Sequence, residues 1–298
     1  MADGYGLRLA GSSGATRRMS TVRDVLLNAV SSSRGRLGVL VLAGLVVAAV
    51  VAPLFLPDPL AQPDILAGAN RSPSAAHWLG TDQLSRDVLA RVATGARISL
   101  SIAFVAVALS ITLGAIVGLV AGYWGGWVDV ALMRLVDGAL AIPRLFVLLL
   151  VVASWEAMPL AAFIVVLGTT GWFGTSRLVR GEVLRIKQEP YVHAAEALGA
   201  SRMRIVLRHL LPNASGPLLV AATLGVGNVI LLEAGLSYLG VGVRPPTPTW
   251  GGMILDAQET LFVAPWASIF PGLAIVVTVL AVNLVGDALR AATDPRLA

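Results

Sequence analysis

Five stretches of this chain run for at least 20 residues without an Asp, Glu, Lys or Arg, namely 37–57, 98–128, 157–176, 209–232 and 260–286. A sixth apolar stretch, 138–153, is interrupted only by Arg144. A helix needs about 20 mostly apolar residues to cross a bilayer. Lipid also forces the backbone to satisfy its own hydrogen bonds, which helices do within one segment. The sequence therefore predicts an all-α integral membrane protein with six transmembrane helices.

The composition excludes most other classes of protein. Soluble domains average about 25% charged residues, whereas this chain has 13%, with 56% hydrophobic residues and a mean hydropathy of +0.80. So apolar a chain does not stay disordered in water. The chain has no cysteine, which excludes a disulfide scaffold, thiolate catalysis and cysteine metal sites.

The positive charges predict the orientation in the membrane. Of the 22 Lys and Arg residues, 17 fall in the segments that lie inside if the N-terminus is cytoplasmic, and 5 fall outside. Loops rich in Lys and Arg stay in the cytoplasm. We therefore expect both termini on the cytoplasmic side of the membrane. The expected layout is a cytoplasmic tail 1–36, a first transmembrane helix 37–57, an external loop 58–96, a five-helix core 97–290 and a cytoplasmic tail 291–298.

A loop between two predicted spans, 189–213, has its own pattern. It reads as two short helices, the first over 191–198, with a break at Gly199. Ser201 is a suitable N-cap for the second helix, and Pro212 is expected to end it. Its apolar side would carry Met203, Val206, Leu207 and Leu210, with arginines opposite. On the residues alone, the loop either docks into a groove of another protein or lies on anionic membrane lipids through its arginines.

This loop resembles the EAA loop of the membrane subunits of ABC importers: Glu-Ala-Ala, three residues, Gly, nine residues, a hydrophobic residue, any residue, Leu-Pro. His193 stands where that family usually has Glu, and the ending 209–213 resembles the peptide-importing branch. In the family the loop is a coupling helix seated in a cleft of the cytoplasmic ATPase. The resemblance implies this ATPase-coupling role for His193, Ala194, Ala195, Glu196, Leu198, Gly199, His209, Leu211, Pro212 and Asn213.

Further segments resemble the C subunits of dipeptide and oligopeptide permeases, namely 77–87, 95–100, 136–143, 233–242 and 245–252. The likeness covers about residues 35–295. It implies the pore-forming permease of an ATP-driven peptide importer of the type I kind, which lies in a bacterial inner membrane and works by alternating access. The implied partners are a second, homologous permease subunit, two ATP-binding cassette domains that bind ATP and Mg²⁺, and an extracytoplasmic substrate-binding protein. Related permeases carry nickel or glutathione, so the substrate stays open.

Three charged residues near the membrane have two interpretations each. Glu233 either contacts substrate in the path or sits at the outer interface, where it caps the polar outer loop or pairs with an arginine such as Arg244. Asp137 and Arg144 flank Pro143 and either line an inner gate or extend to the cytoplasmic interface.

Small residues recur at four-residue spacing in the second span: Ser110, Gly114, Gly118 and Gly122. Such a stripe lets two helices approach closely in lipid. The contact is either static packing inside the subunit or packing against a moving, pore-lining helix.

Nothing in the sequence favours catalysis. The histidines His77, His193 and His209 lack a partner at metal-ligand spacing, and a Gly-x4-Gly-Lys-Ser/Thr phosphate loop is missing. We expect neither a catalytic residue nor a cofactor or metal site in this chain, and no nucleic-acid binding, because the arginines follow membrane sidedness. An intramembrane enzyme would need paired acids or a nucleophile facing inward on the spans, and an ATPase-free channel would leave the loop 189–213 without a role.

Overall fold

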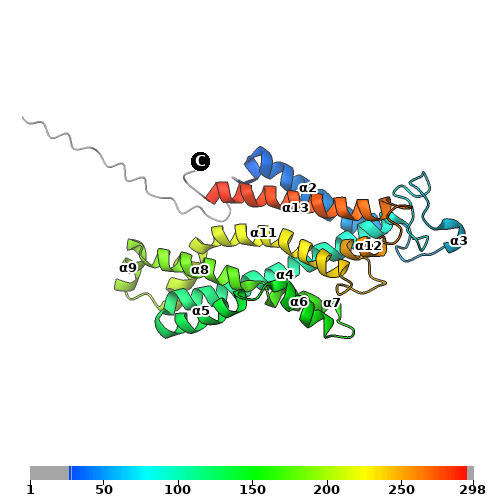
Figure 1. The fold of residues 1–298 in the computed structure, drawn as a ribbon. Coiled ribbons are helices and arrows are strands. Elements are labelled where there is room, and N and C mark those ends of the chain that lie inside the picture. The colour runs from blue at the N-terminus through cyan, green and yellow to red at the C-terminus, as the bar shows by residue number, and fades with distance from the viewer. Residues whose placement is uncertain (1–26, 28, 294–298) are drawn as a thin grey trace, which may run out of the picture.

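The computed structural model describes residue 27 and residues 29–293. These residues form helices and connecting loops, with one isolated β-bridge between Thr81 and Asp87 (Figure 1). In chain order the elements are α2 (Ser33–Val51), η1 (Ala52–Leu54), α3 (Ile65–Gly68), α4 (Val88–Trp124), α5 (Gly126–Leu140), α6 (Arg144–Ala153), α7 (Leu160–Thr169), α8 (Trp172–Lys187), α9 (Pro190–Ala197), α10 (Arg202–Ile205), the π-helical turn η2 (Val206–Leu210), α11 (Leu211–Tyr238), α12 (Trp250–Asp256) and α13 (Trp266–Thr293).

Five of the described helical segments are long and apolar enough to cross a bilayer: Ser33–Leu54, Val88–Trp124, Leu160–Lys187, Arg202–Tyr238 and Trp266–Thr293. A sixth crossing exists if α5 and α6, which meet at an angle of 77°, count as one broken span. The predicted all-α membrane fold is therefore confirmed.

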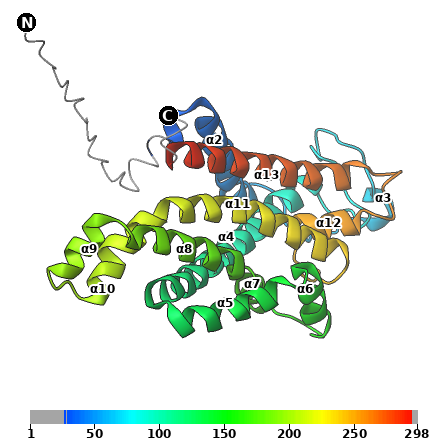
Figure 2. The same ribbon diagram turned by 60° about the vertical axis from the view of Figure 1, so that its left-hand side comes forward.

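The helices pack around the long helix α4. Helices α2 and α13 pack against each other along one side of the molecule (Figures 1 and 2). Helix α11 lies between α13 and α4, whereas α2 also contacts α4 directly. Helix α8 packs along the C-terminal half of α4, and α7 packs against α4 near Ala106 and Leu109. The α9–α10 turn lies at one end of the molecule, while α3 and α12 lie toward the opposite end.

Two buried clusters hold this arrangement together. The larger joins α4, α6, α7 and α11 through fully buried side chains such as Ile102, Leu148, Leu167 and Ile230. The second lies at the α9 end and joins α8 to the turn. Because lipid supplies no hydrophobic drive between helices, close contact of such side chains stabilises the bundle.

Several predicted boundaries differ from the structure, because helices continue past the charge-free stretches. Helix α4 begins at Val88, inside the predicted external loop 58–96, where the Asp87 carboxylate accepts a hydrogen bond of 2.9 Å from the Ala90 amide. At its other end α4 stops at Trp124 with Gly125 at φ +64°, where the glycines predicted an end. A charge is tolerated wherever a helix projects from the membrane, so charge alone does not mark a helix end.

The predicted third span, 138–153, is not one helix. Helix α5 ends at Leu140 and α6 begins at Arg144, so residues 141–143 form a break. Pro143 explains it, because proline lacks an amide donor and disfavours helical geometry in the residue before it.

The predicted tails are largely untested by the structure. Residues 1–26, 28 and 294–298 lie outside the described residues, so most of 1–36 and of 291–298 remains a prediction.

Candidate functional site

The loop 189–213 forms two helices separated by a tight turn. Helix α9 ends in a Schellman motif, in which the Ala200 amide donates to the Ala195 carbonyl at 3.0 Å and Gly199 adopts φ +77°. Only glycine reaches this backbone region without strain. Ser201 then caps α10 by accepting a hydrogen bond from the Arg204 amide. The break at Gly199 and the cap at Ser201 lie where the sequence predicts them.

This loop has a buried side and an exposed side. Val192 of α9 and Ile205 of α10 are each 1% exposed and pack with Val183 and Ile186 of α8. The outward side carries apolar residues that are largely exposed, namely Leu198 at 88%, Met203 at 64% and Leu207 at 56%. The predicted single apolar face is therefore wrong: Val206 and Leu210 turn inward, whereas Met203 and Leu207 turn outward.

The sequence predicts that Pro212 ends the second helix, and this prediction is wrong. Helical structure continues from Arg202 to Tyr238. The π-helical turn η2 makes this possible: the Leu211 amide donates to Val206 five residues back, which widens the turn ahead of the proline. The side-chain amide of Asn213 donates to the His209 carbonyl at 2.6 Å. The loop 189–213 is thus continuous with helix α11, and the two form one candidate membrane span from Arg202 to Tyr238.

The other predicted loop residues lie on its surface. His193 and Ala194 are exposed, Ala195 is half-buried, and the His193 Nδ1 lies 3.8 Å from a carboxylate oxygen of Glu196. The ring of His209 lies 6.0 Å from that of Tyr191, between α9 and η2.

Glu233 is buried within the bundle, with 1% of the residue exposed. One carboxylate oxygen accepts a hydrogen bond from Ser237 at 2.8 Å, and the other accepts from Ser99 of α4 at 3.4 Å. The Ser99 hydroxyl also accepts from the amide of Trp250, at the start of α12. In the described part of the chain Glu233 forms no ion pair with Arg244, and its predicted contact with substrate stays a prediction. Glu233 instead joins α11, α4 and α12.

Asp137 lies on the exposed side of α5, paired with Arg177 of α8. A second pair runs parallel to it, in which Arg180 of α8 donates to both oxygens of Asp129 at 2.5 and 2.6 Å. The sequence did not single out Asp129 or Arg180. Asp129 and Arg180 lie 51 residues apart in the sequence, so their pairing is visible only once both helices are placed. The two pairs attach α5 to α8.

Arg144 begins α6 at the break after α5, and its two predicted roles, at an inner gate or at the cytoplasmic interface, stay predictions. Its guanidinium turns toward the end of α7 and donates to the Leu167 carbonyl at 2.5 Å and to the Thr170 hydroxyl at 3.3 Å. These contacts lie at the break between α7 and α8, where carbonyl groups lose their helical partners. Gly171 leaves room for the guanidinium, because a Cβ there would stand 3.0 Å from an Arg144 nitrogen.

The small-residue stripe of α4 lies against α8. A Cβ added at Gly114 would stand 2.6 Å from Thr175, and one at Gly118 would stand 2.6 Å from the Ser176 carbonyl oxygen. Gly122 faces Val183 in the same way, and Ser110 lies beside Gly171. The stripe is thus part of the contact between α4 and α8 within this subunit.

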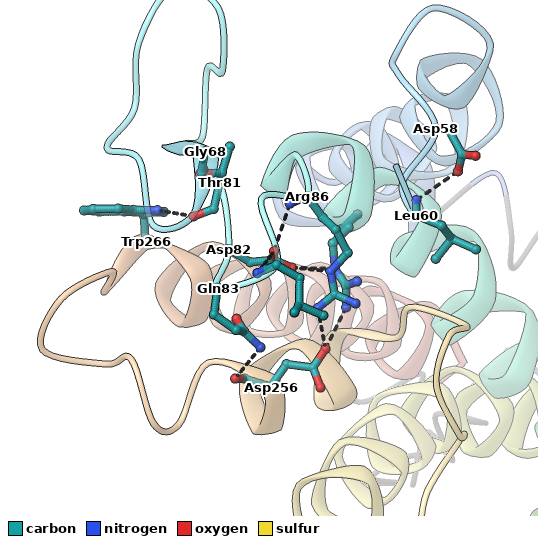
Figure 3. A network of polar contacts seen from close by, with 11 residues as sticks. Asp58, Leu60, Gly68, Thr81, Asp82, Gln83, Arg86, Asp256 and Trp266 are labelled. Carbon is teal, nitrogen blue, oxygen red and sulfur yellow. Dashed lines mark hydrogen bonds and ion pairs between the residues drawn. The ribbon is translucent and has the colours of Figure 1, made fainter. Parts of the chain in front are cut away.

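A network of charges that sequence reasoning missed ties the loop before α4 to α12 (Figure 3). Arg86 donates to Asp82 at 2.6 Å and to Asp256 at 3.1 Å, and Arg91 donates to Asp256 at 2.8 Å. Trp266 of α13 adds a hydrogen bond of 3.0 Å to the Thr81 carbonyl. The paired residues lie far apart in the sequence, so no local pattern reveals them.

The described residues include no group of His, Asp and Glu side chains arranged to hold a metal ion. In the described residues the features that stand out are an exposed apolar loop anchored to membrane helices, one broken span and charged contacts at both ends of the bundle. Such an arrangement suits the transmission of movement through a membrane.

Together, these features define a polytopic helical subunit of a membrane transport system. The chain belongs to the family of binding-protein-dependent transport system inner membrane components, whose profile matches residues 110–298. It is 38% identical to the oligopeptide transport system permease protein OppC of Bacillus subtilis (strain 168), over 94% of this chain and 92% of that protein.

Two further relatives are similar over most of their length. The dipeptide transport system permease protein DppC of Alkalihalophilus pseudofirmus is 38% identical, over 87% of this chain and 85% of its own. The glutathione transport system permease protein GsiD of Pectobacterium atrosepticum is 41% identical, over 76% of this chain and 75% of its own. This chain is therefore a permease subunit of an ABC importer.

Proposed function

We propose that this permease carries dipeptides or oligopeptides into the cell by alternating access, driven by ATP that partner subunits hydrolyse. The similarity to dipeptide and oligopeptide transport system permeases supports a peptide as the substrate. The proposed assembly contains a second, homologous permease, two ATP-binding cassette domains, which bind ATP and Mg²⁺, and an extracytoplasmic substrate-binding protein. One such subunit supplies half of the path.

The proposed orientation places both termini and the α9–α10 turn in the cytoplasm, and α3, α12 and residues 55–87 outside. The distribution of Lys and Arg supports it, since 17 of 22 fall on the proposed inner side. The position of α9 and α10 at the opposite end of the bundle from α3 agrees with this orientation (Figure 1).

The observation that carries the proposal is the two-sided loop 189–213. Leu198 and Met203 present an exposed apolar surface of the kind that docks into a groove of a partner. Val192 and Ile205, on the opposite side, are packed against α8. A cassette domain that moves the exposed side therefore moves α8, and through the continuous η2–α11 segment it moves a membrane helix as well. ATP binding would close the cassettes and open the spans outward.

The test is uptake of a labelled peptide by membranes that contain the complete importer. Gly199→Leu strains a residue at φ +77° and enlarges the proposed docking surface, so uptake should be lost. Ala195→Glu should act likewise by adding a charge, whereas His193→Ala should be mild. Membrane insertion and docking of the external binding protein should persist in all three.

Gly240→Leu is the matched control, because Gly240 also has a positive φ, +79°, and open space around it, but lies at the external end. It should keep co-purification with the cassette subunit, which Gly199→Leu should lose. Normal uptake by both the Gly199 and Ala195 variants would exclude the coupling role and favour a loop that lies on lipid.

Glutathione is a second candidate substrate, since one relative is a glutathione transport system permease. Glutathione is itself a tripeptide, so the two substrates share backbone amides and carboxylates. Competition decides between them: an excess of glutathione should leave uptake of a labelled dipeptide unchanged if dipeptides are the substrate, and should abolish it if glutathione is preferred.

A further inference from the structure

Arg144 lies deep within the region that crosses the membrane. Helices α6 and α7 each contain 10 residues and are joined by the short outer turn 154–159. At 1.5 Å per residue each helix is about 15 Å long, which is half of the ~30 Å hydrocarbon core. Arg144 begins α6 and is bonded to Leu167 and Thr170 at the far end of α7. Its guanidinium therefore lies near the middle of the bilayer.

The charge of Arg144 has no acidic partner in residues 29–293. The arginines at the inner end of the bundle are different, since Arg177 and Arg180 each pair with an aspartate. The two bonds of Arg144 use one hydrogen on Nε and one on a terminal nitrogen, and the residue is only half-buried. An arginine at this depth is costly in lipid and is found facing a bundle interior or a water-filled cavity.

The backbone beside Arg144 points to the same conclusion. Residues 141–143 are non-helical and exposed on the surface of this subunit. At membrane depth, irregular backbone is tolerated only where protein covers it or where it lines a water-filled cavity. The unpaired charge next to the break favours the cavity, because water can solvate both.

We propose that Arg144 and the α5–α6 break line the water-filled path near the bilayer midplane, and that Arg144 binds the carboxylate group of the transported peptide. A guanidinium presents a planar fork that suits a carboxylate. Here Leu167 and Thr170 hold one edge of that fork, which orients the free N–H groups. The carboxylate in this proposal rests on the proposed function, whereas the water-filled path does not.

The first experiment measures charge selectivity beside Arg144 in the assembled importer. Ala141→Cys introduces a single thiol into a chain that has no cysteine. A thiol reagent with a sulfonate group should react with it faster than one with a trimethylammonium group. A positive unit charge several ångströms away in water attracts the anionic reagent and repels the cationic one, which predicts a ratio of their labelling rates of about fivefold. Adding Arg144→Gln should bring the ratio close to one, and Arg144→Lys should retain it.

Arg134→Gln is the matched control, because Arg134 is an exposed arginine on α5 and its loss changes the net charge equally. It should leave the ratio unchanged. An unreactive thiol at position 141 would show that the break is covered, and a ratio insensitive to Arg144→Gln would show that the guanidinium does not face the path. Either result overturns the proposal.

The second experiment tests the carboxylate. An excess of a dipeptide with a free carboxylate should slow labelling at position 141, whereas its C-terminal amide should not. Arg144→Gln should remove this protection. Equal protection by the acid and the amide would exclude carboxylate binding. If the wild-type importer shows charge selectivity but takes up no peptide, the proposed peptide substrate fails while the cationic path remains.

Discussion

The carboxyl group of Glu233 receives hydrogen bonds from hydroxyl groups only, among the contacts that the structure describes. Ser237 lies one turn away on the same helix, whereas Ser99 lies on α4 and also holds the first residue of α12 through its amide. A buried polar group that loses its partner costs about 1–3 kcal/mol. Glu233 therefore contributes to stability through its two acceptor oxygens, whose hydrogen bonds join three helices.

Glu233→Ala should lower the stability of the purified complex by about 1–3 kcal/mol, because it leaves Ser99 and Ser237 without their acceptor and opens a cavity. Glu233→Gln keeps the volume and one acceptor oxygen, so it should recover most of that loss. Thermal unfolding of the two variants measures the difference. Equal, large losses would mean that the negative charge itself is required.

Gly118 offers a second test at this scale. Gly118→Ala should cost about 1–3 kcal/mol, because its Cβ would lie 2.6 Å from atoms of Ser176 and Val179 in α8. Gly44→Ala is the control, since a Cβ on that glycine of α2 meets nothing within 4 Å. It should be neutral or slightly stabilising, through helix propensity. Similar stability of the two variants would contradict the close contact between α4 and α8.

Among the elements, those governed by local chemistry were predictable. The turn at Gly199 and the cap at Ser201 follow from backbone conformation and side-chain capping, which neighbouring residues determine. The prediction from Pro212 was wrong because a π-helical turn accommodates the proline. The turn shifts the hydrogen-bond register by one residue, and no local sequence pattern marks that shift. Likewise, Pro143 lies inside the stretch 138–153 that the sequence predicts as one span, and the break there, with its angle of 77°, appears only in the structure.

The two ion pairs between α5 and α8 lead to a prediction for these elements. Asp129→Asn should weaken the attachment of α5 by about 1 kcal/mol, the upper range for partly exposed pairs. The exchanged double variant Asp129→Arg with Arg180→Asp should recover part of this loss, because it restores the attraction with reversed polarity. Thermal unfolding at low and high salt measures it. A double variant as unstable as the sum of its single changes would exclude direct pairing.

At the scale of the whole molecule, the number of spans was predictable and the contacts across the bundle were not. The apolar runs are long enough to count crossings, with α5 and α6 taken together. The network of Arg86, Arg91 and Asp256 joins positions up to 170 residues apart, and nothing near Arg86 in the sequence indicates its partner. For the same reason the role of Glu233 can be recognised only once the positions of the helices are known.

The orientation is the prediction that belongs to this scale. Leu66→Cys and Leu198→Cys form a matched pair, since these leucines are 98% and 88% exposed and lie toward opposite ends of the molecule. In intact cells an impermeant thiol reagent should label position 66 and spare position 198. Opening the membrane should make both reactive. Labelling of position 198 in intact cells would reverse the proposed orientation.

Helix α4 has 37 residues, which corresponds to about 55 Å at 1.5 Å per residue, nearly twice the thickness of the hydrocarbon core. Near one end Arg91 pairs with Asp256 of α12, and near the other end the carbonyl of Tyr123 accepts a hydrogen bond from Lys187. A tilt of this long helix that displaces one of its ends therefore displaces the other end as well. Thermodynamic linkage then requires reciprocity: if nucleotide binding inside alters the affinity for a docking protein outside, docking alters nucleotide affinity by the same factor.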